Sequence, residues 1–214
     1  LFNPVSALII RKFGMKQTTF WGMIAVSVVY TLPVNLPSVA LVSLGLCLTG
    51  MAIAVLNVAM NTCTSVIEVN EGMHTMSTSH GLFSLGLMSG SLIASFSYGW
   101  QINPGTHMFF LAGIGIFMAF WARHPIFSIH QPIVAGVDAM QEKSGDVRPP
   151  GVKKEIFWMV VLSVCSNFTE GTMADWTAVY MKEVVQTNAY FIGWGLAAYS
   201  FCMALGRLMG DGIV

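Results

Sequence analysis

Long apolar stretches without charged residues dominate this sequence. No Asp, Glu, Lys or Arg occurs between Val39 and Ile67. That stretch exceeds the roughly 20 apolar residues that an α-helix needs to cross a bilayer. Only 9% of the 214 residues are charged and 55% are hydrophobic, whereas about a quarter of the residues in a soluble domain are charged. The sequence therefore predicts an all-α integral membrane protein whose partner is the lipid bilayer.

Short loops and one long polar segment divide the chain. We predict one partial span at residues 1–10 and about six full transmembrane helices at residues 18–32, 39–67, 77–98, 106–122, 155–180 and 189–205. Residues 123–154 are polar and rich in Pro and Gly, a composition typical of linkers. We therefore predict an N-terminal helix bundle over 1–122, a cytoplasmic linker over 123–154, and the start of a C-terminal bundle over 155–214.

The distribution of basic residues predicts the orientation of these helices. Counting spans places nearly all Lys and Arg on one side of the membrane, and only Lys182 on the other. The basic side faces the cytoplasm under the positive-inside rule. The residues assigned to that side are Arg11, Lys12, Lys16, Arg123, Lys143, Arg148, Lys153, Lys154 and Arg207.

A polar stripe marks the span over 39–67. Asn57, Asn61, Ser65 and Glu68 fall at i, i+4, i+8 and i+11, on one face of a helix. Such groups are costly against lipid and point to a protein interior or a water-filled path. We predict that Asn57 and Asn61 bind substrate; the alternative is that they are interhelical hydrogen-bond contacts. Glu68, near the cytoplasmic end, is predicted to take part in gating.

The span over 77–98 carries further polar and small residues. His80 and Ser84 are predicted to contact substrate in the same path, although either could bridge helices or bond its own backbone. Gly86 and Gly90 form a small-xxx-small pair, which predicts close approach of a neighbouring helix.

An intramembrane carboxylate distinguishes the span over 155–180. Glu170 lies near its middle, and intramembrane carboxylates are functional by default. We predict that Glu170 binds substrate and carries a coupling proton, with Gly171 allowing the helix to open there; the alternative is a local structural pairing. Asn167 and Trp176 are predicted substrate contacts, and Asp175 a gating residue, although Trp176 could equally be an interfacial anchor.

Other classes of function find little support in the sequence. The net charge is zero, so no nucleic-acid partner is predicted. The four cysteines lack metal-ligand spacing, and no HExxH motif occurs, so neither a metal nor a cofactor is predicted. An intramembrane protease using Ser89 would need a Gly-x-Ser motif that is absent. We therefore predict that the protein is not an enzyme.

Three segments carry a resemblance to a known family. They cover residues 57–86, 170–180 and 203–211, and they resemble the major facilitator superfamily (MFS), in the branch of the fucose-permease-like and YbjJ-type proteins. The resemblance implies the twelve-helix MFS fold, of which this chain would be a fragment from the end of helix 2 to helix 8. It also implies that Arg207 and Asp211, in the motif after helix 8, take part in gating.

The same resemblance implies a function. It predicts a monomeric, multi-pass carrier of the inner (plasma) membrane that moves a small polar, sugar-like solute by alternating access, in symport with protons. Fucose-permease relatives carry a coupling carboxylate at the position of Asn57, which is an amide here and cannot titrate, so Glu170 is the predicted proton carrier. Two alternatives stay open, namely an MFS efflux carrier and a transporter-like sensor that does not translocate.

Overall fold

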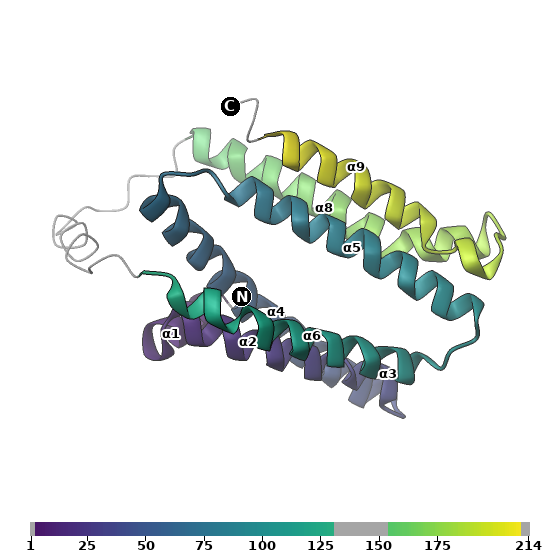
Figure 1. Ribbon diagram of the computed structural model, residues 1–214. Helices are drawn as coiled ribbons and strands as arrows, with labels where there is room; N and C mark the ends of the chain where they lie inside the picture. The colour runs from purple at the N-terminus through teal and green to yellow at the C-terminus, as the bar shows by residue number, and fades with distance from the viewer. Residues whose placement is uncertain (1–2, 131–153, 211–214) are drawn as a thin grey trace. The chain divides into compact units, whose positions relative to one another are not determined.

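The described part of the chain is helical throughout. The computed structural model describes residues 3–130 and 154–210, in which no strand occurs (Figure 1). The elements are α1 (Asn3–Phe13), α2 (Met15–Val29), α3 (Leu32–Asn35), α4 (Val39–Glu71), α5 (Met76–Gly99), α6 (Pro104–Ser128), α8 (Lys154–Glu183), η1 (Ala189–Phe191) and α9 (Trp194–Gly210). The predicted all-α fold is confirmed. By length and composition, α4, α5, α6 and residues 189–210 could each cross a membrane.

Capping residues define where the long helices begin and end. Ser38 starts α4, where its hydroxyl accepts a hydrogen bond from Leu41 N at 3.3 Å. Asn103 starts α6, where its Oδ1 accepts from Gly105 N at 2.8 Å. Gly72 ends α4 in the left-handed conformation with φ 64°, which a glycine adopts without steric cost. The loop between α4 and α5 therefore spans only residues 72–75.

Helix α8 runs unbroken past Gly171, the residue predicted to allow the helix to open. Asn167 Nδ2 donates to Ser163 O at 2.7 Å, and Thr169 Oγ1 donates to Cys165 O at 3.0 Å. Such bonds satisfy polar side chains within the preceding turn. Gly171 is helical as well. Helix α8 is therefore continuous at Gly171 in this structure, because the polar side chains bond the helix backbone without breaking it.

The helices divide into two compact units. The first unit contains α1 to α4, α6, the first residues of α5 up to Gly81, and the last residues of α9 from Arg207. The second unit contains the rest of α5 with α8, η1 and most of α9. Residues 131–153 of the predicted linker lie outside the described residues. The predicted division into bundles over 1–122 and 155–214 stays a prediction.

Helix α2 lies at the centre of the first unit, where it packs against both α4 and α6. Phe20 is buried, and its ring meets Phe120 and Phe127 of α6 edge-on at centroid distances of 5.6 and 6.0 Å. The hydroxyl of the neighbouring Thr19 lies 3.5 Å from the buried Cys63 thiol of α4. These contacts join the three helices around a small, largely apolar core.

Serines on one face of α5 form the packing surface in the second unit. Ser84 and Ser95 are buried, and Ser95 Oγ donates to Tyr190 O of η1 at 2.8 Å. Ser91 Oγ donates to Gly193 O at 2.6 Å. We call Ser84, Ser91 and Ser95, which follow one another at seven and four residues, the serine seam. Through Ser91 and Ser95 it joins α5 to η1 and the turn that precedes α9.

The glycine pair predicted to pack is not part of this seam. No heavy atom lies within 4 Å of a Cβ built on Gly86 or Gly90. At 100° per residue both positions fall on the face of α5 opposite to the serines. Close approach occurs instead at Gly81, where a Cβ would lie 2.8 Å from two side-chain atoms of Leu208.

Candidate functional site at the ends of α4, α5 and α9

The carboxylate of Glu68 holds the start of α5. Its Oε1 accepts hydrogen bonds from the backbone N–H groups of Thr75 at 2.6 Å and Met76 at 2.7 Å. The first N–H groups of a helix have no partner within the helix and carry a partial positive charge. The anionic side chain at the end of α4 therefore caps the next helix across the short loop.

The end of α9 meets the start of α5 at the same place. Ser77 Oγ donates to Arg207 O at 2.6 Å, and Arg207 Nη1 donates to His80 O at 3.3 Å. The side chain of Leu208 lies against Gly81, which leaves room for it because glycine has no Cβ. These hydrogen bonds and the close apolar contact hold the two helix ends together.

A cavity of about 640 Å³ opens between these helix ends. It brings together one carboxylate, one guanidinium and two imidazoles. His74 is exposed, and the other three groups are half-buried. We call it the junction cavity, and it is lined by Glu68, His74, Met76, Ser77, His80, Arg207 and Gly210. Such a group of polar side chains can bind a polar or charged ligand, or form contacts that change as the helix ends separate.

The junction cavity unites three residues that the sequence predicts to be functional, namely Glu68, His80 and Arg207. It adds His74 and Ser77, which sequence reasoning missed. Ser77 lies three residues before His80 and so shares its helix face, a spacing that could have identified it. His74 lies in the loop, where no periodicity applies. Asp211 lies outside the described residues.

The two asparagines of α4 bind each other. Asn61 Nδ2 donates to Asn57 Oδ1 at 2.8 Å, as expected for amides four residues apart on one helix face. Asn57 is exposed and Asn61 is half-buried. Neither lines the junction cavity, so the structure places His80 with Glu68 and Arg207 and not with the asparagines.

The remaining predicted residues lie in the second unit. Ser84 is fully buried in the serine seam. Glu170 is half-buried on α8, whereas Asp175 and Trp176 are exposed on the same helix. Ser89, the residue weighed as a protease nucleophile, donates its hydroxyl to Leu85 O at 2.9 Å, a bond within its own helix.

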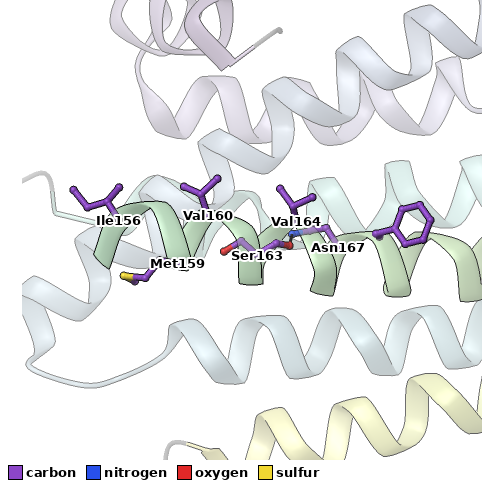
Figure 2. Close-up of a pocket in the computed structure, with 7 residues that line it drawn as sticks. Ile156, Met159, Val160, Ser163, Val164 and Asn167 are labelled. Carbon is purple, nitrogen blue, oxygen red and sulfur yellow. Dashed lines mark hydrogen bonds between the residues drawn. The ribbon is translucent and has the colours of Figure 1, made fainter. Parts of the chain in front are cut away.

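Asn167 lies in an open groove along one side of α8. The groove has a volume of about 740 Å³ and is mostly apolar. Figure 2 shows its labelled residues following one another along the helix, with Ser163 and Asn167 as the polar members. The full lining is Ile156, Met159, Val160, Ser163, Val164, Asn167 and Phe168.

Comparison with known proteins identifies relatives among membrane transporters. No protein-family model and no solved structure matches the chain. Over all 214 residues the chain is 25% identical to an uncharacterized MFS-type transporter of Yersinia pestis, and covers 53% of that protein. Over 180 residues, or 83% of the chain, it is 26% identical to the uncharacterized transporter y4wD of Sinorhizobium fredii, and covers 45% of it. The chain thus spans about half the length of the curated relatives it matches.

These relatives agree with the structural findings. The long apolar helices fit a bilayer, and the similarity to an MFS-type transporter extends along the whole chain. The predicted resemblance to the superfamily is confirmed, whereas its particular branch stays a prediction. The chain is accordingly an all-α, multi-pass membrane protein related to the transporters of the major facilitator type.

Proposed function

We propose that this chain is part of a secondary active carrier, which moves a small polar solute across the cell's inner membrane by alternating access. The observation that carries the proposal is the similarity over the whole chain to an MFS-type transporter. In such carriers two helix bundles rock about a site near the middle of the membrane. We propose that polar side chains of α4, α5 and α8 contribute to such a site.

The asparagine pair of α4 suits a hydroxylated, sugar-like solute. Asn61 donates one of its two side-chain N–H groups to Asn57 Oδ1. Both N–H groups of Asn57 and the carbonyl oxygen of Asn61 make no hydrogen bond within the described residues, so donors and an acceptor are available on one face of α4. We include His80, Ser84, Asn167, Glu170 and Trp176 as further substrate contacts.

We propose the junction cavity as part of the cytoplasmic gate. The bonds of Arg207 with Ser77 and His80 join α9 to α5, and these bonds must break if the two helix ends are to separate. In this proposal Glu68 keeps its cap on α5 when α9 moves away, because its two hydrogen bonds join α4 to the start of α5 and do not involve α9. Asp175 and Asp211 are the other proposed gating residues.

Proton coupling is proposed to use Glu170. An ionised carboxylate is costly within a bilayer, and this cost favours a group that binds and releases a proton as its access changes. In this scheme α8 remains a continuous helix, so its accessibility would change by movement of the whole helix and not by opening at Gly171. Symport with the solute follows if both share one path.

Counterflow in proteoliposomes tests the carrier proposal. The full-length protein is reconstituted, loaded with an unlabelled sugar from a panel, and offered the labelled sugar outside. We expect exchange of at least one sugar, and Asn57→Ala with Asn61→Ala should raise its half-saturation concentration about threefold to tenfold. Thr64→Val is the matched control, since the Thr64 hydroxyl bonds Met60 O of its own helix.

Other outcomes favour the alternatives. Saturable sugar binding without exchange would identify a sensor. Exchange of hydrophobic cations without any sugar exchange would identify an efflux carrier.

A further inference from the structure

Positive charge gathers at one end of the first unit. Arg11 and Lys12 end α1, Lys16 starts α2, and Arg123 lies near the end of α6. Lys16 Nζ donates to Phe127 O at 3.1 Å, and the Arg123 guanidinium lies 5.9 Å from the Phe20 ring centroid. These two contacts bring the α1–α2 turn and the end of α6 together. We call Arg11, Lys12, Lys16 and Arg123 the basic patch.

No described residue forms an ion pair with the cations of the basic patch. None of the four cations forms an ion pair within residues 3–130 and 154–210, where the ion pair observed is Lys182 with Glu183. The neighbouring end of α4 carries Glu68, which is bonded to the start of α5, and the exposed Glu71. Arg11, Lys12 and Arg123 are themselves exposed. The basic patch can therefore accept an external anion.

A cavity lies within reach of the basic patch. It has a volume of about 520 Å³ and is lined by Phe120, Arg123, His124, Phe127 and Ser128. Arg123 makes no hydrogen bond within the described residues, so its five N–H donors remain available. Lys16 uses one of its three ammonium donors on Phe127 O and keeps two. The cavity thus combines hydrogen-bond donors with apolar ring surface.

Exposed aromatic side chains continue from this cavity toward the apolar part of the helices. Trp121 is 71% exposed, Trp21 60% and Phe120 55%. The Trp121 ring is supported by Phe117, with the ring centroids 5.8 Å apart. Tryptophan side chains prefer the boundary between the headgroups and the hydrocarbon of a membrane. An end of the unit with such exposed tryptophans suits the headgroup level of a bilayer.

We propose that the basic patch and its cavity bind the phosphate headgroup of an anionic glycerophospholipid. Lys16 and Arg123 would donate to the phosphodiester oxygens, while the acyl chains would run along the exposed rings of Phe117, Phe120 and Trp121. Basic pockets at the membrane surface bind such headgroups, each cation contributing about a fivefold gain in affinity. The site does not depend on which solute is carried, and failure of the carrier proposal would leave it standing.

Lipid retention measures this preference directly. The full-length protein is placed in nanodiscs with equal amounts of phosphatidylglycerol and phosphatidylcholine, extracted into mild detergent, and analysed by native mass spectrometry for bound lipid. We expect phosphatidylglycerol to be enriched about tenfold or more over phosphatidylcholine. Lys16→Gln with Arg123→Gln should bring the ratio to within about twofold of that in the nanodisc.

Three controls make the result decisive. Lys182→Gln, at a different basic residue, should keep the wild-type ratio, and so should the charge-preserving pair Lys16→Arg with Arg123→Lys. Inorganic phosphate at constant ionic strength should leave the lipid bound. The proposal is overturned by an unenriched wild type, by retention in the double glutamine variant, by loss in either control variant, or by displacement with inorganic phosphate, which would indicate a free-anion site.

Discussion

Removing the carboxylate of Glu68 should loosen the start of α5. Glu68 Oε1 accepts from Thr75 N at 2.6 Å and Met76 N at 2.7 Å. Replacing a side chain that caps a helix N-terminus by alanine costs about 0.5–2 kcal/mol. Both hydrogen bonds are charge-assisted because the acceptor is a carboxylate, which places the cost of Glu68→Ala in the upper half of that range, at about 1–2 kcal/mol. Local opening should become about 5–30 times more frequent.

Hydrogen exchange of the loop peptide is the direct assay. In nanodiscs, the amides of Thr75 and Met76 should exchange about 5–30 times faster in Glu68→Ala than in the wild type. Glu68→Gln keeps an acceptor oxygen but loses the charge, so its effect should be smaller, at about threefold. Glu71→Ala is the matched control, because Glu71 is exposed at the end of the same helix.

The reasoning would be refuted if Glu68→Ala left both amides unchanged, or if Glu71→Ala accelerated them equally. The first result would mean that the loop holds its shape without the cap. The second would mean that charge at the end of α4 matters and that the two hydrogen bonds do not.

Three further predictions concern other parts of the chain. Glu170→Gln should abolish proton-driven accumulation in uptake assays while counterflow is retained, and unchanged accumulation would remove Glu170 from the mechanism. Gly81→Ala should lower the thermal unfolding temperature relative to Gly86→Ala, because its Cβ meets Leu208 at 2.8 Å and overpacking costs about 1–3 kcal/mol; equal unfolding temperatures would contradict this. A cysteine at Ser144 should be labelled by impermeant maleimide only from the cytoplasmic side, and labelling from outside the cell would overturn the orientation.

The positions of the helices can be predicted from the sequence because a segment that spans lipid must be apolar, whichever helices it packs against. The uncharged stretch from Val39 predicts α4 at its observed start. Spacing within one helix is equally readable, so Asn57 and Asn61 are adjacent as predicted. Local capping also explains why α6 starts after Asn103.

Contacts between distant segments could not be predicted in this way. The bond between Arg207 and His80 joins residues 127 positions apart, and no periodicity states which helix ends meet. The role of Glu68 depends on a loop only four residues long, which brings its carboxylate back to α5. Gly86 and Gly90 satisfy a packing motif, yet the motif gives no information on which face of α5 meets a neighbour.

The serine seam has a consequence for how this sequence can diverge. The hydroxyls of Ser91 and Ser95 bond the main-chain oxygens of Gly193 and Tyr190. A carbonyl oxygen is present whatever side chain a residue carries, so position 190 can change without loss of its acceptor. Gly193 is different, because any Cβ there would collide with the Ser91 carbonyl. In the turn before α9, position 190 should therefore tolerate more residue types than position 193.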